Sequence, residues 1–170
     1  MLEKINEYLV GKNYQSTYEK ADTNNIYDRL QIKFIAVING QNTYWPIELG
    51  NLPVEDESFK GLSLLQFYIP IVGEVAAVNY LPICDLMTKL NAKLTVGCFG
   101  YLASHQLVFF KHNLILSNDH FTNNCAIIDK SLAIIFYMLV NFQKPLAVVA
   151  QGNSSVEEAM GEMQLSYIYK

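Results

Sequence analysis

The side chains that could bind a metal ion or attack a substrate belong to few residues. They are three histidines and three cysteines: His105, His112, His120, Cys84, Cys98 and Cys125. An odd interval separates His105 from His112, so on one strand their imidazoles would face opposite sides. No histidine or cysteine pair has the spacing of a zinc site. We therefore expect no metal ion and no other cofactor, and interpret each histidine as a surface or hydrogen-bonded residue.

A cysteine and a histidine could still act as a nucleophile and its base if they met in space. Cys98 and His112 fall on two strands that we predict to be neighbours, so such a meeting is geometrically allowed. Cys98 lies between a glycine and a phenylalanine, however, and is typical of a small core residue. Cys84 and Cys125 fall in apolar helical patterns and have the same interpretation. We therefore predict no catalytic residue.

The acidic pairs and glycine-containing stretches do not indicate catalysis either. Glu55–Asp56–Glu57 is typical of a solvated loop, and Glu157–Glu158 suits the first turn of a helix, where negative charge is favourable. Neither acidic stretch has an identifiable partner for general acid–base catalysis. The stretches over 97–100 and 152–155 lack the further glycines or the lysine of a phosphate-binding loop.

Composition limits the partners and the compartment. With 12 basic and 16 acidic residues the net charge is −4, which provides no positive field for a phosphate backbone, so we expect no nucleic-acid partner. Hydrophobic residues make up 51% of the chain, which excludes a disordered protein. The odd number of cysteines argues against a disulfide framework, and the N-terminus has no secretory apolar segment. We expect a cytoplasmic protein.

Hydrophobic periodicity predicts the elements that would position these side chains. In the N-terminal part we expect a helix over 2–11, a loop over 13–25, a strand over 26–38, a hairpin turn at Asn39–Gly40, a returning strand over 43–49, a loop over 50–60 and a strand over 62–71. The C-terminal part predicts a helix over 74–92, strands over 94–102 and 106–116, a long helix from near 121 with Pro145 bending or ending it, and a short helix over 156–163.

The pattern inside these segments adds three predictions. The helix over 74–92 has an apolar stripe with i, i+3, i+4, i+7 spacing, made of Ile83, Leu86, Met87 and Leu90. Both faces of the strand over 106–116 are apolar in its first part, which predicts a central strand. Gly152 is the predicted stop of the helical segment that follows Pro145.

Several single residues refine these elements further. Pro82 would kink the helix over 74–92 or start a second helix in its first turn. Gly97 and Gly100 mark a bulge or a close backbone approach, and Ser155 with Glu158 has the spacing of a capping box. The order α-β-β-β-α-β-β-α predicts an α+β fold with a largely antiparallel sheet and helices packed on it. We expect a single domain over 1–170.

Tyr44 and Trp45 lie on the returning strand, next to a proline that cannot donate a ladder hydrogen bond. We therefore predict that this strand is short or lies at the sheet edge. An exposed aromatic pair at an edge would suit peptide capture by strand addition, which makes Tyr44 and Trp45 candidate peptide-binding residues. In the alternative interpretation one of the two packs inward and the other stays half-exposed.

The long helix contains an apolar run over 131–142. This run is well short of the roughly 20 residues of a spanning helix, so we expect no membrane insertion. It is apolar all round, whereas a helix lying on a sheet needs only one apolar stripe. We therefore predict a surface covered by a second subunit in a homodimer. Its residues would be Ile134, Ile135, Met138, Leu139 and Phe142.

The chain resembles the YbjN-like family of bacterial proteins, which share the type III secretion chaperone-like fold. The resemblance covers about residues 62–160. It is carried by the strand LLQFYIPI (64–71), a helix ending in KLN (89–91), the strands LTVGCFGY (94–101) and LVFFKHNLIL (107–116), and a long helix followed by AQGNSSVEEAM (150–160). It implies an α+β fold that is often dimeric, with no known catalytic activity, and a protein-binding or regulatory role.

These observations favour a non-enzymatic, dimeric, chaperone-like or regulatory module that binds another protein. The alternative is a small-molecule sensor or an uncharacterised enzyme with a pocket between helix and sheet. Titratable residues with shifted pKa values around one concave pocket would favour the alternative. An apolar groove or a free sheet edge without such residues would favour the binding module.

Overall fold

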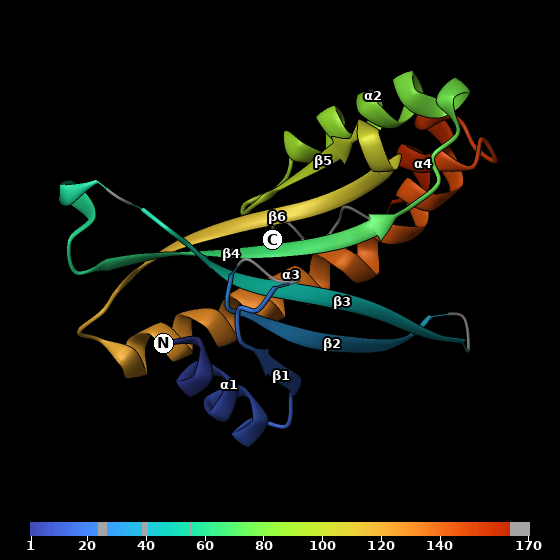
Figure 1. Cartoon of the computed structure of the whole chain (residues 1–170). Helices are drawn as coiled ribbons and strands as arrows, with labels where there is room; N and C mark the ends of the chain where they lie inside the picture. Colours follow the sequence, from blue (N-terminus) through green and yellow to red (C-terminus); the bar gives the residue numbers. More distant parts are fainter. Residues whose placement is uncertain (24–26, 39–40, 55, 164–170) are drawn as a thin grey trace. The chain divides into compact units, whose positions relative to one another are not determined.

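The computed structural model describes residues 1–23, 27–38, 41–54 and 56–163 (Figure 1). Within these ranges the helices are α1 (Leu2–Gly11), α2 (Tyr80–Asn91), α3 (Phe121–Ala150) and α4 (Val156–Glu162). The strands are β1 (Gln15–Glu19), β2 (Arg29–Ile38), β3 (Gln41–Leu52), β4 (Leu62–Val72), β5 (Cys98–Leu102) and β6 (Leu107–Ser117). Three short 3-10 helices lie between these elements: η1 (Glu57–Phe59), η2 (Ala77–Asn79) and η3 (Ala103–His105).

The strands form one antiparallel sheet with the order β1-β2-β3-β4-β6-β5. The predicted α+β class with an antiparallel sheet is thereby confirmed. The predicted position of the strand over 106–116 in the sheet interior also agrees, because β6 lies between β4 and β5. The turn at Asn39–Gly40 lies outside the described residues, as does Glu55.

The order of elements differs from the prediction at both ends. β1 occupies part of the segment expected as a loop, and it pairs with β2 so that Ser16 lies opposite Ile32 and Tyr18 opposite Leu30. β1 is an edge strand of mostly polar residues. β1 is held by backbone hydrogen bonds to β2, which lies further along the chain. The hydrophobic periodicity of its own residues is therefore a poor predictor of this strand. At the other end α4 is the short helix predicted over 156–163, which the predicted order α-β-β-β-α-β-β-α did not count.

β3 is not the edge strand that the sequence suggested. It is paired on both sides, with β2 and with β4. Pro46 lies opposite Lys33 of β2, whereas the β3–β4 register begins at Glu48. The proline therefore lies outside the β4 ladder, and its missing N–H removes no bond there. The strands at the sheet edges are β1 and β5.

The chain divides into two compact units. The first comprises Met1–Ile69 with Lys111–Phe136, and the second comprises Pro70–Phe110 with Tyr137–Lys170. β4, β6 and α3 contribute residues to both units. The predicted single domain over 1–170 stays a prediction.

The core of the first unit contains alternate residues of β2, β3 and β4 together with one face of α1 and of α3. Its buried side chains include Leu2, Ile5, Leu9, Leu30, Ile32, Trp45, Ile47, Leu49, Leu65, Phe67, Cys125, Ile128, Leu132 and Ile135. The ring of Phe136 lies 4.9 Å from that of Phe34 and 6.3 Å from that of Trp45, between centroids. These contacts bring together strands and a helix whose contacting residues are 91 and 102 positions apart in sequence.

The core of the second unit is built on the predicted stripe of α2. Its members Ile83, Leu86, Met87 and Leu90 are buried, which confirms that stripe. Phe99 makes edge-to-face contacts with Phe110 and Phe142, at 5.4 and 6.0 Å between centroids. A Cβ on Gly100 would lie 2.5 Å from Cζ of Phe109, so the predicted close approach of the backbone is confirmed at that glycine.

The residues expected to meet a second subunit need correction. The structure buries Ile135, Met138, Leu139 and Phe142, which are 0–4% exposed, and leaves only Ile134 accessible, at 42%. The first four are therefore core residues and are not available to a partner of the folded chain. Residues 132–140 carry almost no polar side chain, so the sequence did not mark which side of the helix faces outward. The homodimer itself stays a prediction.

α3 is long and apolar enough, by length and composition, to cross a membrane; among the described residues it is the one such helix. Core helices of soluble proteins meet the same criterion, and 44% of its most apolar window is buried inside the structure. The predictions of no membrane insertion and of a cytoplasmic location are not decided by this finding.

Candidate functional site

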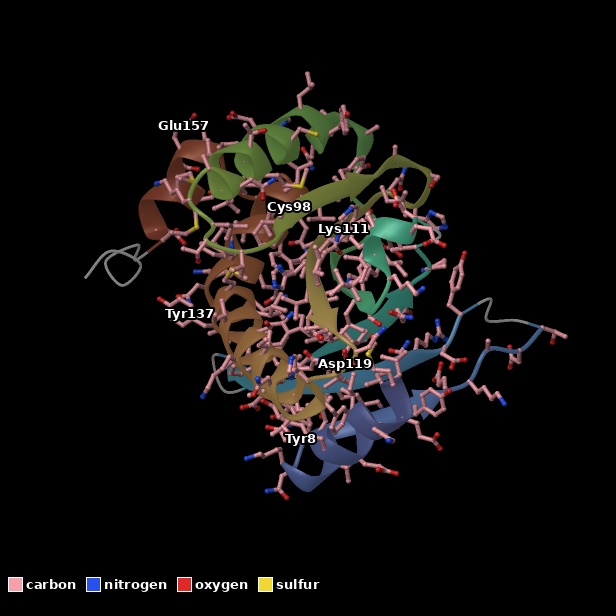
Figure 2. The ribbon with its side chains drawn as sticks, turned by 90° about the vertical axis from the view of Figure 1, so that its left-hand side faces the viewer. Tyr8, Cys98, Lys111, Asp119, Tyr137 and Glu157 are labelled. Atoms are coloured by element: carbon pink, nitrogen blue, oxygen red, sulfur yellow. The ribbon has the colours of Figure 1, made fainter. Side chains whose placement is uncertain are left out.

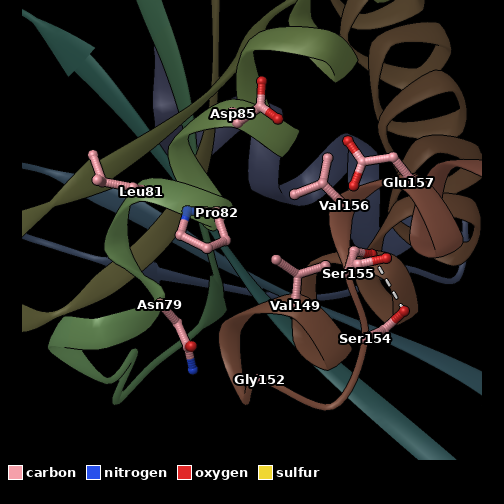
Figure 3. A pocket seen from close by; sticks show the side chains of 10 residues that line it. All are labelled: Asn79, Leu81, Pro82, Asp85, Val149, Gly152, Ser154, Ser155, Val156 and Glu157. Atoms are coloured by element: carbon pink, nitrogen blue, oxygen red, sulfur yellow. Dashed lines mark hydrogen bonds between the residues drawn. The ribbon is translucent and has the colours of Figure 1, made fainter.

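An open pocket of about 630 Å³ lies in the second unit, between the start of α2, the end of α3 and the start of α4 (Figure 3). Its lining residues are Asn79, Leu81, Pro82, Asp85, Val149, Gly152, Ser154, Ser155, Val156 and Glu157. The pocket is bounded by helices and their connecting loop, and so differs in place from the expected pocket between a helix and the sheet.

The wall at the end of α3 is held by a well-defined helix terminus. The N–H of Gly152 donates to the carbonyl of Val149 at 3.0 Å, and that of Asn153 donates to Val148 at 2.8 Å. This is the Schellman pattern, and Gly152 has the positive φ of 73° that it requires. Asn79 Nδ2 donates to the carbonyl of Ala150 at 2.9 Å, which ties η2 to the same terminus.

The wall at the start of α4 is held by the predicted capping box, which is confirmed. Ser155 Oγ accepts from the N–H of Glu158 at 3.2 Å, and the Glu158 carboxylate accepts from the N–H of Ser155 at 2.9 Å. Hydrogen bonds to the Glu158 carboxylate lower its pKa, first the one from the Ser155 backbone and then those from the side chains of Ser155 and Ser154. The first turn of α4 thereby keeps a carboxylate at a position where the helix favours negative charge.

Large apolar side chains are exposed on η2 and in the first turn of α2, two elements that contribute residues to this pocket. Val78 is 82% exposed and Leu81 is 74% exposed, and Leu81 lines the pocket together with Pro82. Val149 and Val156 are buried and form its apolar floor. We call Val78, Leu81 and Pro82, which are all exposed, the α2 patch. Pro82 lies in the first turn of α2, which agrees with the second of its two predicted roles.

The polar rim of the pocket is an acidic pair bridged by one lysine. Lys89 Nζ lies 2.6 Å from Oδ2 of Asp85 and 3.5 Å from Oε1 of Glu157. The hydrogen bond to Asp85 is the main cause of the raised pKa of Lys89. The three side chains are exposed or half-exposed, and together they carry one excess negative charge. They are solvated and paired, so they lack the buried, unpaired character of an acid–base centre.

The histidines lie at three separate places. The His112 ring stacks on Phe67 with 5.9 Å between centroids, and burial lowers its pKa. His105 Nδ1 lies 2.9 Å from Ser104 Oγ in an exposed turn. His120 lines a smaller hollow of about 300 Å³ at the start of α3. In the described part of the chain, His, Cys, Asp and Glu form no group of three or more that could hold a metal ion.

The cysteines divide by exposure. Cys125 is buried, Cys84 is half-buried and Cys98 is exposed. The interpretation of Cys98 as a core residue was therefore wrong: as the first residue of the edge strand β5 it lies at the boundary of the unit rather than inside it. Figure 2 labels Cys98 at this strand.

Tyr44 and Trp45 do not form a joint surface. Trp45 is 2% exposed in the core, whereas Tyr44 is 60% exposed. The alternative interpretation, with one ring inward and one outward, is thus the correct one, because neighbouring residues of a strand face opposite sides. Tyr44 and Trp45 pair with β2, and they lie outside the β3–β4 ladder, which begins at Glu48. Peptide capture by strand addition at this pair stays a prediction.

The α2 patch was not among the residues predicted from the sequence. The helical stripe of α2 directed attention to its buried residues, and Leu81 lies off that stripe. A usable signal was present: the apolar residues Val78, Leu81 and Pro82 precede the stripe and do not share its spacing. No family model matches this chain, and no curated protein matches it.

Proposed function

We propose that this chain is a non-enzymatic protein-binding module that takes a partner segment at the α2 patch and the pocket beside it. The observation that carries the proposal is the exposure of Leu81, which lines an open pocket, together with that of Val78 on η2. Neighbouring large apolar side chains at such exposure mark interaction sites more often than they mark ordinary surface. An apolar side chain of the partner would enter the pocket over Val149 and Val156.

The charges at the rim favour a basic partner. Asp85 and Glu157 offer two carboxylates to one lysine, Lys89. The Glu158 carboxylate lies one residue further along α4. A lysine or arginine beside the apolar anchor would therefore meet an excess of negative charge. The proposed occupant is a segment with one large apolar side chain flanked by basic residues.

The finer assignments are part of the same proposal. They are a chaperone-like or regulatory role, a homodimer, a cytoplasmic location and a relation to the YbjN-like family with its chaperone-like fold. The α+β class with an antiparallel sheet is compatible with them. A small-molecule sensor or an enzyme is the rival assignment, and the solvated, paired carboxylates of the rim favour the binding module over it.

Selection from a displayed random-peptide library against the purified protein tests this function. We expect enriched peptides that contain a Leu, Phe or Met next to Lys or Arg. Leu81→Ser should weaken the best peptide about tenfold, since a buried apolar anchor is worth about 1.5 kcal/mol or more. The fold should survive because Leu81 is 74% exposed.

Ile115→Ser is the matched control, because Ile115 is an apolar side chain that is 60% exposed on β6. It should leave peptide affinity unchanged. Enrichment of peptides without basic residues would contradict the proposed partner chemistry. Binding that is equal in Leu81→Ser and the unaltered protein, or no enrichment at all, would contradict the proposed site.

A further inference from the structure

We infer that residues 164–170, which follow α4, bind the α2 patch and its pocket in the same chain, with Ile168 as the apolar anchor and Lys170 at the acidic rim. A partner would have to displace this segment, so the chain regulates access to its own site. The inference rests on the proposed function, because it takes the same pocket as the binding site. Residues 164–170 lie outside the described part of the chain; their sequence and the position of the end of α4 carry the inference.

The 164–170 segment has the chemistry that the site requires. It reads QLSYIYK, so four of its seven residues are large and apolar or aromatic, and its single charged side chain is the lysine. In an extended chain, residues two apart point to the same side. Ile168 entering the pocket would therefore direct Lys170 to the rim. This is the occupant proposed for the site, a large apolar side chain with a basic residue beside it.

The pocket offers a complementary surface in apolar contact and in charge. Val149 and Val156 form its floor beside the exposed α2 patch (Figure 3). At the rim, Asp85 and Glu157 share Lys89, at 2.6 and 3.5 Å from its Nζ, which leaves one excess negative charge for a second ammonium group. Contact with the 164–170 segment would remove apolar side chains on both sides from water.

The end of α4 brings the segment within reach of the pocket. Lys144 Nζ on α3 lies 3.3 Å from Oε2 of Glu162, and Val149 of the pocket floor follows Lys144 by about 7.5 Å along the helix axis. Along α4, Glu162 is about 9 Å from Val156. An extended chain from Glu162 to Ile168 spans roughly 20 Å, about twice these distances. All of these residues belong to the second unit.

The covalent link makes even a weak contact effective. A segment tethered by a few residues has an effective concentration on the order of millimolar at a nearby site. A contact with an intrinsic dissociation constant of about 0.2 mM would therefore fill the pocket most of the time. A partner binds only the chains whose pocket is free, so its apparent affinity falls by the same factor.

Alkylation of a thiol in the pocket tests the inference without any partner. Ser154 lines the pocket and is half-buried, so Ser154→Cys introduces a thiol there. The background carries Cys84→Ser and Cys98→Ser, and so retains only the buried Cys125 of the natural thiols. Mass spectrometry follows the reaction with iodoacetamide, a small neutral reagent, and circular dichroism verifies that each variant is folded.

We expect Ile168→Ser to speed this alkylation about three- to tenfold, because it removes the anchor that covers the pocket. Leu165→Ser is the matched control and should leave the rate unchanged. It removes an apolar side chain of the same segment that points to the other side of an extended chain. Equal rates in all three proteins, or equal acceleration by both substitutions, would overturn the inference. Acceleration on dilution from about 100 to about 1 μM would place the segment in the pocket of a second copy and would also overturn it.

Peptide affinity tests the regulation of the site. The best selected peptide should bind Ile168→Ser about three- to tenfold more tightly than the unaltered protein, and Leu165→Ser should match the unaltered protein. Lys170→Gln should have a smaller effect in the same direction and Lys170→Arg none, since only the first removes the charge. Unchanged affinity in Ile168→Ser would overturn the regulation and leave the peptide site intact. Failure to select any peptide would contradict the proposed function instead, and the alkylation rates would still decide whether the segment occupies the pocket.

Discussion

The hydroxyl of Tyr14 joins the segment before β1 to α3. It donates to Oδ1 of Asp129 at 2.8 Å, and the Tyr14 ring lies 6.0 Å from Phe34 in an edge-to-face arrangement. Burial, and then the hydrogen bond to Asp129, raise the pKa of Tyr14 to about 12. Both causes favour the neutral phenol, which is the form that donates the hydrogen bond.

We expect Tyr14→Phe to lower the free energy of unfolding at neutral pH by about 1 kcal/mol, the net value of one hydrogen bond. Because the folded pKa is raised, this contribution is fully present below the ordinary pKa of 10 and is lost as the pH rises through about 12. Urea unfolding of both proteins between neutral pH and pH 12 measures the difference. Tyr44→Phe, at a 60% exposed position, should change little. A Tyr14→Phe deficit that persists undiminished up to pH 12 would contradict this account.

At the scale of the elements, Asn91 closes part of the free edge of β5. Its Oδ1 accepts from the N–H of Phe99 at 2.7 Å, and its Nδ2 donates to the carbonyl of the same residue at 2.9 Å. The side-chain amide thus makes the two bonds that a neighbouring strand would make. Edge strands with unpaired backbone groups invite pairing with other chains, so this contact protects the edge as well as stabilising the unit.

We expect Asn91→Ala to destabilise the protein by about 1–3 kcal/mol, because it leaves both backbone groups of the buried Phe99 without these partners. It should also aggregate sooner on heating, which light scattering measures. Asn113→Ala is the matched control. It removes an exposed amide whose Oδ1 accepts from Gln66 at 2.9 Å, and it should cost less than about 0.5 kcal/mol. Equal effects of the two variants would show that the edge contact has no special role.

At the scale of the whole molecule, the three cysteine thiols differ in how deeply they are buried. Cys98 is exposed, Cys84 half-buried and Cys125 buried. Burial also raises the pKa of Cys125, which reduces its reactive thiolate at neutral pH. The native chain therefore presents its thiols to a reagent in a defined order.

We expect Ellman's reagent to label Cys98 rapidly, Cys84 slowly and Cys125 only when the protein unfolds. Cys98→Ser should remove the rapid phase and leave the others unchanged. A reducing agent should not alter the melting temperature, since all three cysteines are free. Rapid labelling of Cys125 in native buffer would show that the core of the first unit opens far more readily than its packing implies.

Local sequence signals predicted the elements that depend on nearby residues. The stripe of α2, the capping box of α4 and the termination of α3 near Gly152 all agree with the structure. Each depends on side chains and backbone groups within about one or two helical turns, so the information is present in a short window. The candidate site was harder to predict from the sequence. Exposure of the α2 patch could be suspected from its spacing, but the pocket beside it requires the end of α3 and the start of α4 to meet α2.

Sequence by itself determined the α+β class, most of the helices and strands, and the buried face of α2. Only the tertiary structure decided that β1 is a strand, that β3 is paired on both sides and that Trp45 is buried against Phe136. It also decided which side of α3 faces outward. The physical reason is range: helix caps and stripes follow from neighbours in sequence, whereas strand pairing and the burial of an all-apolar helix depend on residues far away along the chain.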